Sequence, residues 1–166
     1  MINFKLCSIS APITILFLVP ALLCAADAKI INYSSKPELI IHEVESRGAK
    51  IMVLELYSDH KAWHSVLQKI ASGDESWLRV ANALRAGTDA GTTEMLTLAV
   101  GEALEHNPNN VFRIASKAFE VSAICGGPDV DDVRYDSYEL SMKAISLRID
   151  KVAAIKDPSL EKICKE

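Results

Sequence analysis

The sequence predicts an all-α fold, and three observations lead to that prediction. Apolar residues recur at helical spacing in almost every stretch of the 166-residue chain beyond residue 28. Alternation over the length of a strand is hard to find, and glycine and proline stand where one helical stretch ends and the next begins. We therefore expect a compact bundle of about six to seven antiparallel helices with one disulfide.

The first element, residues 1–28, has the organisation of a secretory signal peptide. Lys5 is the only charged residue before Asp27, and an apolar run over residues 13–23 is broken by Pro20. That run is well short of the roughly 20 apolar residues that a membrane-spanning helix needs. We expect it to direct export and then to be removed.

Small residues at the end of this segment predict where cleavage occurs. Cleavage after Ala28 fits best, and Ala25 is a competing site. A lipoprotein signal using Cys24 is disfavoured because Leu23 stands where a small residue is expected. The expected product is a single helical domain over 29–166 in the periplasm or outside the cell, without a further membrane span.

The first predicted helix of the mature chain begins near Lys36. Ser-Lys-Pro-Glu at residues 35–38 forms a capping box with proline in the first turn. After Gly48, the apolar residues 51–57 suit either a buried strand or a helix. A helix is predicted there because a lone strand would have no partner.

Two amphipathic helices follow, and each ends at a glycine. The apolar stripe of the first begins at Trp63 and precedes Gly73, and that of the second begins at Trp77 and precedes Gly87, so the patterns superpose with a shift of 14 residues. Asp74 is placed to cap the second helix. Both tryptophans begin apolar stripes and are predicted to lie in the core.

The superposition indicates either a duplicated helical hairpin or a chance match between two amphipathic helices. Antiparallel helices joined by short loops resemble the packing of HEAT-like helical repeats, and this resemblance concerns architecture alone. No motif in the sequence identifies a named family.

A largely buried helix is expected over residues 92–106. Its apolar residues occupy most of the circumference and leave Glu94, Gly101 and Glu105 on a narrow polar side. Asn107 and the proline after it then begin the next helix, which is expected to continue to Cys125.

The C-terminal part contains a long predicted helix over residues 137–156 and a short one after Asp157-Pro158. Cys125 and Cys164 are the two cysteines that remain after signal cleavage, and an exported chain favours a disulfide between them. That bridge would constrain the unfolded chain by about 4 kcal/mol. Metal binding or redox chemistry is disfavoured because two thiols do not complete a zinc shell and no Cys-x-x-Cys motif is present.

His60 and His64 are the candidate metal ligands. They stand one helical turn apart, which is the spacing at which two histidines of a helix share a metal ion. Lys61 occupies the position where a zincin has its glutamate, and no third ligand lies near downstream. The alternative is that both rings lie at the solvent boundary of the Trp63 stripe.

Two acidic loops are candidate binding elements. The loop over residues 87–93 contains Asp89, which would repel a phosphate, and its simpler interpretation is an interhelical turn that caps the next helix. The loop after Cys125 contains Asp129, Asp131 and Asp132 but lacks the ligand rhythm of an EF-hand. It is interpreted as a solvated capping loop or as an anionic patch for a basic partner.

The composition narrows the function without identifying it. A net charge of -4 without a Lys/Arg cluster argues against a nucleic-acid partner, and no cofactor motif or catalytic triad spacing is found. We expect a protein-binding role, with an inhibitor or immunity-type protein as one form of it. The alternatives are a ligand or metal carrier or hydrolase using Asp59, His60, His64 and Asp89, and a structural or envelope-assembly protein.

Overall fold

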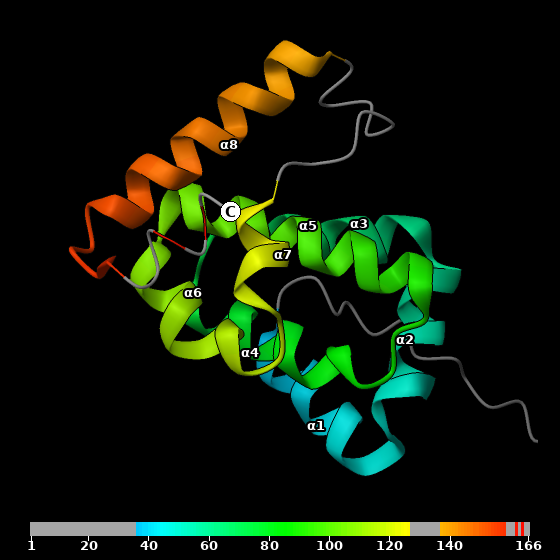
Figure 1. Cartoon of the computed structure of the whole chain (residues 1–166). Coiled ribbons are helices and arrows are strands. Elements are labelled where there is room, and N and C mark those ends of the chain that lie inside the picture. Colours follow the sequence, from blue (N-terminus) through cyan, green and yellow to red (C-terminus); the bar gives the residue numbers. More distant parts are fainter. Residues whose placement is uncertain (1–35, 127–136, 159–161, 163, 165–166) are drawn as a thin grey trace, which may run out of the picture. The chain divides into compact units, whose positions relative to one another are not determined.

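The computed structural model describes residues 36–126, 137–158, 162 and 164, and these residues form helices with no strand among them (Figure 1). The predicted signal peptide and the loop with Asp129, Asp131 and Asp132 lie outside the described residues. The all-α prediction is confirmed. The elements are α1 (Pro37–Arg47), α2 (Ala49–Ser58), α3 (His60–Ala71), α4 (Glu75–Arg85), α5 (Ala90–His106), α6 (Pro108–Ile114), the 3₁₀-helix η2 (Ala115–Lys117), α7 (Val121–Cys125) and α8 (Tyr138–Ala153).

The first two helices are separated by Gly48, which has a φ of 93° that only glycine adopts without strain. Residues 51–57 are helical, as predicted. Lys36 is the N-cap of α1 and makes no side-chain capping bond, and Ser35 of the predicted capping box lies outside the described residues.

Helices α3 and α4 follow the predicted pattern closely. Asp74 caps α4 by accepting hydrogen bonds from the backbone amides of Ser76 and Trp77. Gly73 ends the turn after α3. It has a φ of 74°, a left-handed backbone conformation that glycine adopts without strain. Both Trp63 and Trp77 are buried in the core, as predicted.

Helix α5 is the centre of the bundle and packs against α3, α4, α6, α7 and α8. It begins at Ala90, two residues before the predicted start, because Asp89 and Thr92 form a reciprocal capping box. Gly101 does not lie on an exposed polar side, as the sequence had suggested. It is buried against α7 and α8, where a Cβ atom would approach the Ile124 carbonyl oxygen to 2.8 Å.

The helix predicted from Asn107 to Cys125 is wrong as a single element. Asn107 caps α6 as expected, but the chain continues as η2 and then turns at Glu120, which has an extended backbone. The turn allows Phe119 to enter the core and leaves Ser122 exposed. This division gives eight α-helices in the described part of the chain instead of the expected six to seven.

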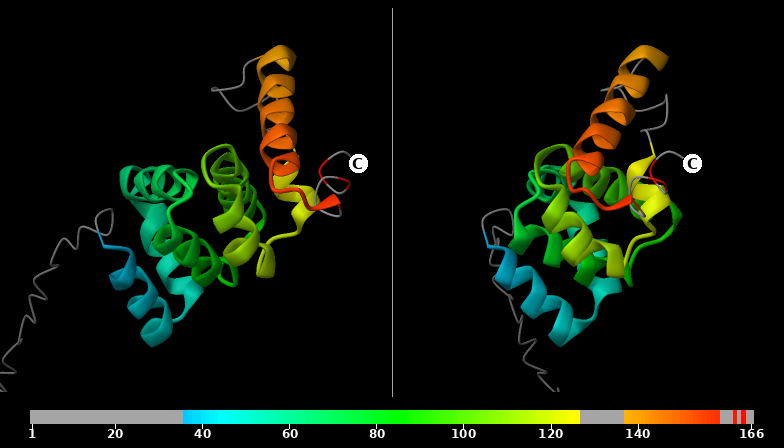
Figure 2. Two further views of the ribbon diagram at one scale, coloured as in Figure 1. Left: turned by 90° about the vertical axis from the view of Figure 1, so that its left-hand side faces the viewer. Right: turned by 60° about the vertical axis from the view of Figure 1, so that its left-hand side comes forward.

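Helix α8 packs on α5 and α7, and its N-terminal half extends beyond them (Figure 2). A disulfide joins Cys125 to Cys164, as predicted, with the Cα atoms 5.0 Å apart. Among the described residues after Asp157, Pro158, Lys162 and Cys164 are helical. No helix in the described part of the chain is long and apolar enough to cross a membrane.

A buried arginine joins α8 to the rest of the bundle. The Arg148 side chain is 1% exposed, and its Nε donates a hydrogen bond of 3.1 Å to Glu105 Oε1 on α5. Its Nη1 donates to the carbonyl oxygen of Gly126 at the end of α7. The absent side chain of Gly101 leaves room for this guanidinium, because a Cβ there would lie 2.9 Å from Arg148 Nη1.

Candidate protein-binding surface

The candidate metal ligands His60 and His64 lie on the exposed surface of α3. The His60 ring packs edge-on against Tyr57, with ring centroids 5.6 Å apart, and His64 Nε2 is 3.1 Å from Gln68 Nε2. Asp59 caps α3 through its carboxylate. The described residues contain no group of three His, Cys, Asp or Glu side chains that could hold a metal ion.

The carboxylate of Asp89 is engaged in the capping box of α5. Thr92 donates to Asp89 Oδ1 through both its hydroxyl group, at 2.6 Å, and its backbone amide, at 2.9 Å. These two hydrogen bonds, the hydroxyl first, lower the pKa of Asp89 because they favour the charged carboxylate. Asp89 thus has a structural role in starting α5.

The largest apolar side chains exposed on the α2–α3–α5 side of the bundle form a surface that we call the α2 stripe. It consists of Ile51, Leu54 and Tyr57 on α2 together with Met95 on α5, and these side chains are 40% to 60% exposed. The three α2 residues are spaced by three, so neighbouring side chains lie one above the other on the helix. The opposite side of α2 is buried through Met52, Val53 and Leu56.

Contacts with Trp63 hold Tyr57 and Met95 of the α2 stripe in place. The Tyr57 ring packs edge-on against the buried Trp63 ring, with centroids 6.1 Å apart. The Trp63 indole N–H in turn lies 3.3 Å from Met95 Sδ, in hydrogen-bond geometry. The buried Trp63 therefore contacts both Tyr57 on α2 and Met95 on α5.

An ion-pair cluster joins the end of α1 to α2. Arg47 forms ion pairs with Glu55, at 2.5 Å, and with Glu43, at 3.2 Å. The hydrogen bonds to these two carboxylates raise the pKa of Arg47. This cluster pairs one arginine with two carboxylates, and Lys50 on α2 is exposed as well.

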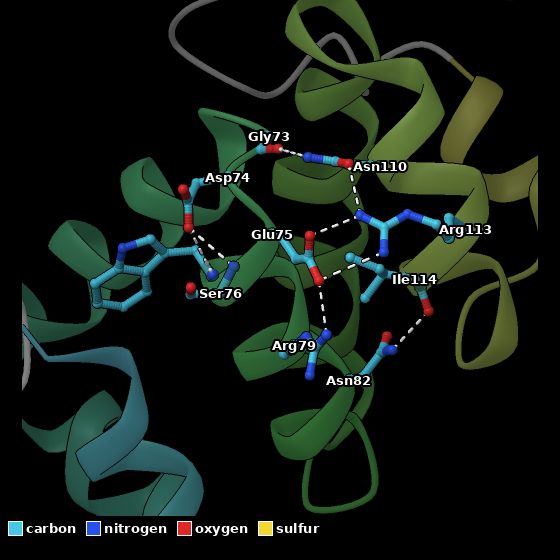
Figure 3. A network of polar contacts seen from close by, with 10 residues as sticks. Gly73, Asp74, Glu75, Ser76, Arg79, Asn82, Asn110, Arg113 and Ile114 are labelled. Carbon is cyan, nitrogen blue, oxygen red and sulfur yellow. Dashed lines mark hydrogen bonds and ion pairs between the residues drawn. The ribbon is translucent and has the colours of Figure 1, made fainter.

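A second polar network lies on the exposed side of α4 and α6 (Figure 3). Glu75 on α4 accepts hydrogen bonds from Arg113, at 2.7 Å, and from Arg79, at 2.6 Å. Arg113 also contacts Asn110, whose side chain donates to the Gly73 carbonyl oxygen at 3.2 Å. The network connects the start of α4 to α6. Its two arginines, Arg79 and Arg113, both pair with the single carboxylate of Glu75.

The Glu75 network predicts a pH-dependent contribution to stability. Hydrogen bonds from Arg113 and then Arg79 lower the pKa of Glu75 from 4.5 to about 2. A carboxyl group with a depressed folded-state pKa stabilises the fold above its unfolded pKa and loses that effect as pH falls through its folded pKa. Thermal unfolding of Glu75→Gln should therefore occur at a lower temperature than that of the wild type at neutral pH, and the difference should disappear toward pH 2.

The effect should be small because these side chains are exposed to solvent and salt. Glu45→Gln is a suitable control, because Glu45 is exposed and makes no ion pair within the described residues. An unfolding-temperature difference for Glu75→Gln that stays constant from pH 7 to pH 2 would contradict the assigned ion pairs.

Comparisons of the chain with protein-family models, with curated proteins and with solved structures found no match.

Sequence reasoning missed both the α2 stripe and Arg148. The run over residues 51–57 was predicted to be helical, but the sides of that helix were not assigned: one side is buried, and Ile51, Leu54 and Tyr57 are exposed. Arg148 stands four residues after the buried Ala144 and four before the buried Val152. In the sequence, this helical spacing was the sign that the arginine is buried.

Proposed function

We propose that the protein is exported and acts by binding another protein through the α2 stripe. The observation that supports binding most directly is the row of Ile51, Leu54 and Tyr57 on the solvent side of α2, continued by Met95. Exposed contiguous apolar surface is unusual on a monomeric protein and commonly marks an interaction site. Export is supported by the signal-peptide pattern of residues 1–28.

The make-up of the α2 stripe is that of an interface core. Aromatic residues and methionine are enriched in protein interfaces, and the stripe has one of each. Tyr57 is held by the edge-on contact with Trp63, so little side-chain entropy remains to be lost on binding. Tyr57 is therefore the expected anchor of the interaction.

An acidic recognition surface is the competing way to bind a protein. Asp89 and the carboxylates at residues 129, 131 and 132 would attract a basic partner, and that attraction weakens with salt. Apolar contacts do not weaken in this way. Salt dependence therefore separates the two modes, and an inhibitor or immunity-type role is compatible with either.

The test is capture of partners by the purified, oxidised protein from periplasmic and cytoplasmic extracts of its own source, at low and high salt. Leu54→Glu should lower recovery of a specific periplasmic partner by about tenfold or more, because a charge would replace the most exposed side chain of the stripe. Leu147→Glu on α8 is the matched control, since it makes the same change at another exposed leucine.

Far-UV circular dichroism should show that both variants remain folded. The proposal is overturned by a partner that both variants retain equally, by a partner lost at high salt, or by partners found in the cytoplasmic extract alone.

A further inference from the structure

Helix α8 has a small apolar contact with the rest of the bundle. Its buried residues are Ser141, Ala144, Arg148 and Val152. Of these, only Val152 belongs to the main hydrophobic cluster of the described residues, and the half-buried Ile149 packs against that cluster. The shorter helix α4 buries Trp77, Leu78, Val80, Ala81 and Leu84. Because apolar burial provides most of the stability of a docked helix, α8 is held weakly by its own side chains.

The polar part of this contact adds little to its strength. The ion pair of Arg148 with Glu105 and its hydrogen bond to the Gly126 carbonyl oxygen compensate for the water that the buried guanidinium has lost. Nη2 of the same guanidinium is buried and has no hydrogen-bond partner among the described residues. A buried ion pair with incomplete hydrogen bonding contributes little net stability, although removing one partner alone is costly. Docking of α8 is therefore expected to be marginal without a further restraint.

The disulfide supplies a restraint of that kind. Cys125 is the last residue of α7 and directly precedes Gly126, while Cys164 follows α8 in the chain. The bond joins residues 39 positions apart and so closes a ring that contains the whole of α8. While this ring is closed, α8 is connected to the end of α7 in both chain directions, so an undocked α8 stays close to its site. Opening the ring leaves α8 connected through the preceding chain alone.

Helix α7, to which this ring is anchored, has its own contacts with the core. It packs on α5, and its Ile124 side chain is fully buried. The Ile124 carbonyl oxygen lies so close to α5 that a Cβ at Gly101 would approach it to 2.8 Å. We therefore expect α7 to remain on α5 when the disulfide is broken, whereas α8 loses one of its two connections.

We propose that the Cys125–Cys164 disulfide is a redox latch that keeps α8 docked on α5 and α7. Reduction by a dithiol transfers two electrons and two protons to the bond, so that both cysteines become thiols and the reagent becomes a cyclic disulfide. Helix α8 then undocks while the rest of the bundle stays folded. Because disulfides persist in oxidising compartments, the latch makes docking of α8 a property of the exported chain.

Hydrogen exchange of the purified protein, measured by mass spectrometry before and after treatment with dithiothreitol, tests this latch. The test needs no binding partner and no export, so it is independent of the proposed function. Alkylation of free thiols confirms that Cys125 and Cys164 have been reduced. Amides of α8 should then exchange about tenfold faster or more, whereas those of α3 and α4 should keep their rates.

The variant Cys125→Ala/Cys164→Ala separates loss of the bond from an effect of the reagent. Its α8 amides should exchange rapidly with and without dithiothreitol. In the wild type, removal of dithiothreitol followed by reoxidation should restore slow exchange in α8. The proposal is overturned if exchange in α8 is unchanged by reduction or by the double substitution, or if it stays fast after reoxidation. Equal acceleration in every helix also overturns it, because the disulfide would then stabilise the bundle as a whole.

Discussion

Replacing Gly87 with alanine is expected to destabilise the fold by about 3 kcal/mol or more, a large part of the stability of a typical domain. A Cβ atom at this position would lie 2.2 Å from the carbonyl carbon of Ala49 and 2.4 Å from the amide nitrogen of Lys50. These are backbone atoms in the first turn of α2, so no rotation of a side chain can relieve the overlap. The loop after α4 would have to move away from α2.

Urea unfolding followed by far-UV circular dichroism measures this effect. Gly91→Ala is the matched control, because no atom of the described residues lies within 4 Å of a Cβ there and the residue is in the first turn of α5. That change should stabilise the protein by about 0.5–1 kcal/mol, since alanine restricts the unfolded chain and favours the helix. If Gly87→Ala unfolded at the wild-type urea concentration, the close packing of this loop on α2 would be incorrect.

Gly87 also illustrates what a sequence can and cannot predict. The glycine was correctly placed just after the end of α4, which stops at Arg85. Glycine is needed at Gly73 and at Gly87 for different reasons, since Gly73 has a positive φ and Gly87 does not. A glycine with a positive φ that ends a helix, such as Gly73, is a local feature that the sequence indicates well. The close approach of Gly87 to Ala49, 38 residues earlier, depends on the tertiary fold.

The same distinction explains the helix boundaries. Asp74 and Asn107 were predicted as caps, and both form the expected side-chain bonds, because capping involves only the next few residues. The break between α6 and α7 was not predicted. It places Phe119 in the core, and burial of a large aromatic side chain outweighs the helical periodicity of that segment.

The candidate site was harder to predict than the fold. Histidines and aspartates were chosen because their chemistry is recognisable in a sequence, yet Asp59 and Asp89 are helix caps in the structure. The α2 stripe has no such signature. Leu54 differs from the buried Leu56 only in which side of α2 faces the core, and that depends on the helices packed around it.

The second large effect is expected for Arg148→Met, which should destabilise the protein by about 3–5 kcal/mol. Methionine keeps much of the length of the arginine side chain but donates no hydrogen bond. The Glu105 carboxylate and the Gly126 carbonyl oxygen would then lose their donors in a partly buried site. Urea unfolding of the variant, in its oxidised form, gives the free-energy difference.

A second substitution separates two free energies: the cost of leaving Glu105 without its partner, and the contribution of the intact Arg148–Glu105 pair. Glu105→Leu in the Arg148→Met background removes the carboxylate, so the double variant should regain most of the lost stability. Incomplete hydrogen bonding of the native guanidinium favours that recovery, because Arg148 Nη2 is buried and has no hydrogen-bond partner among the described residues. If the two substitutions were additive, Arg148 and Glu105 would not be coupled, and the arginine would stabilise α8 only by filling the space that Gly101 leaves.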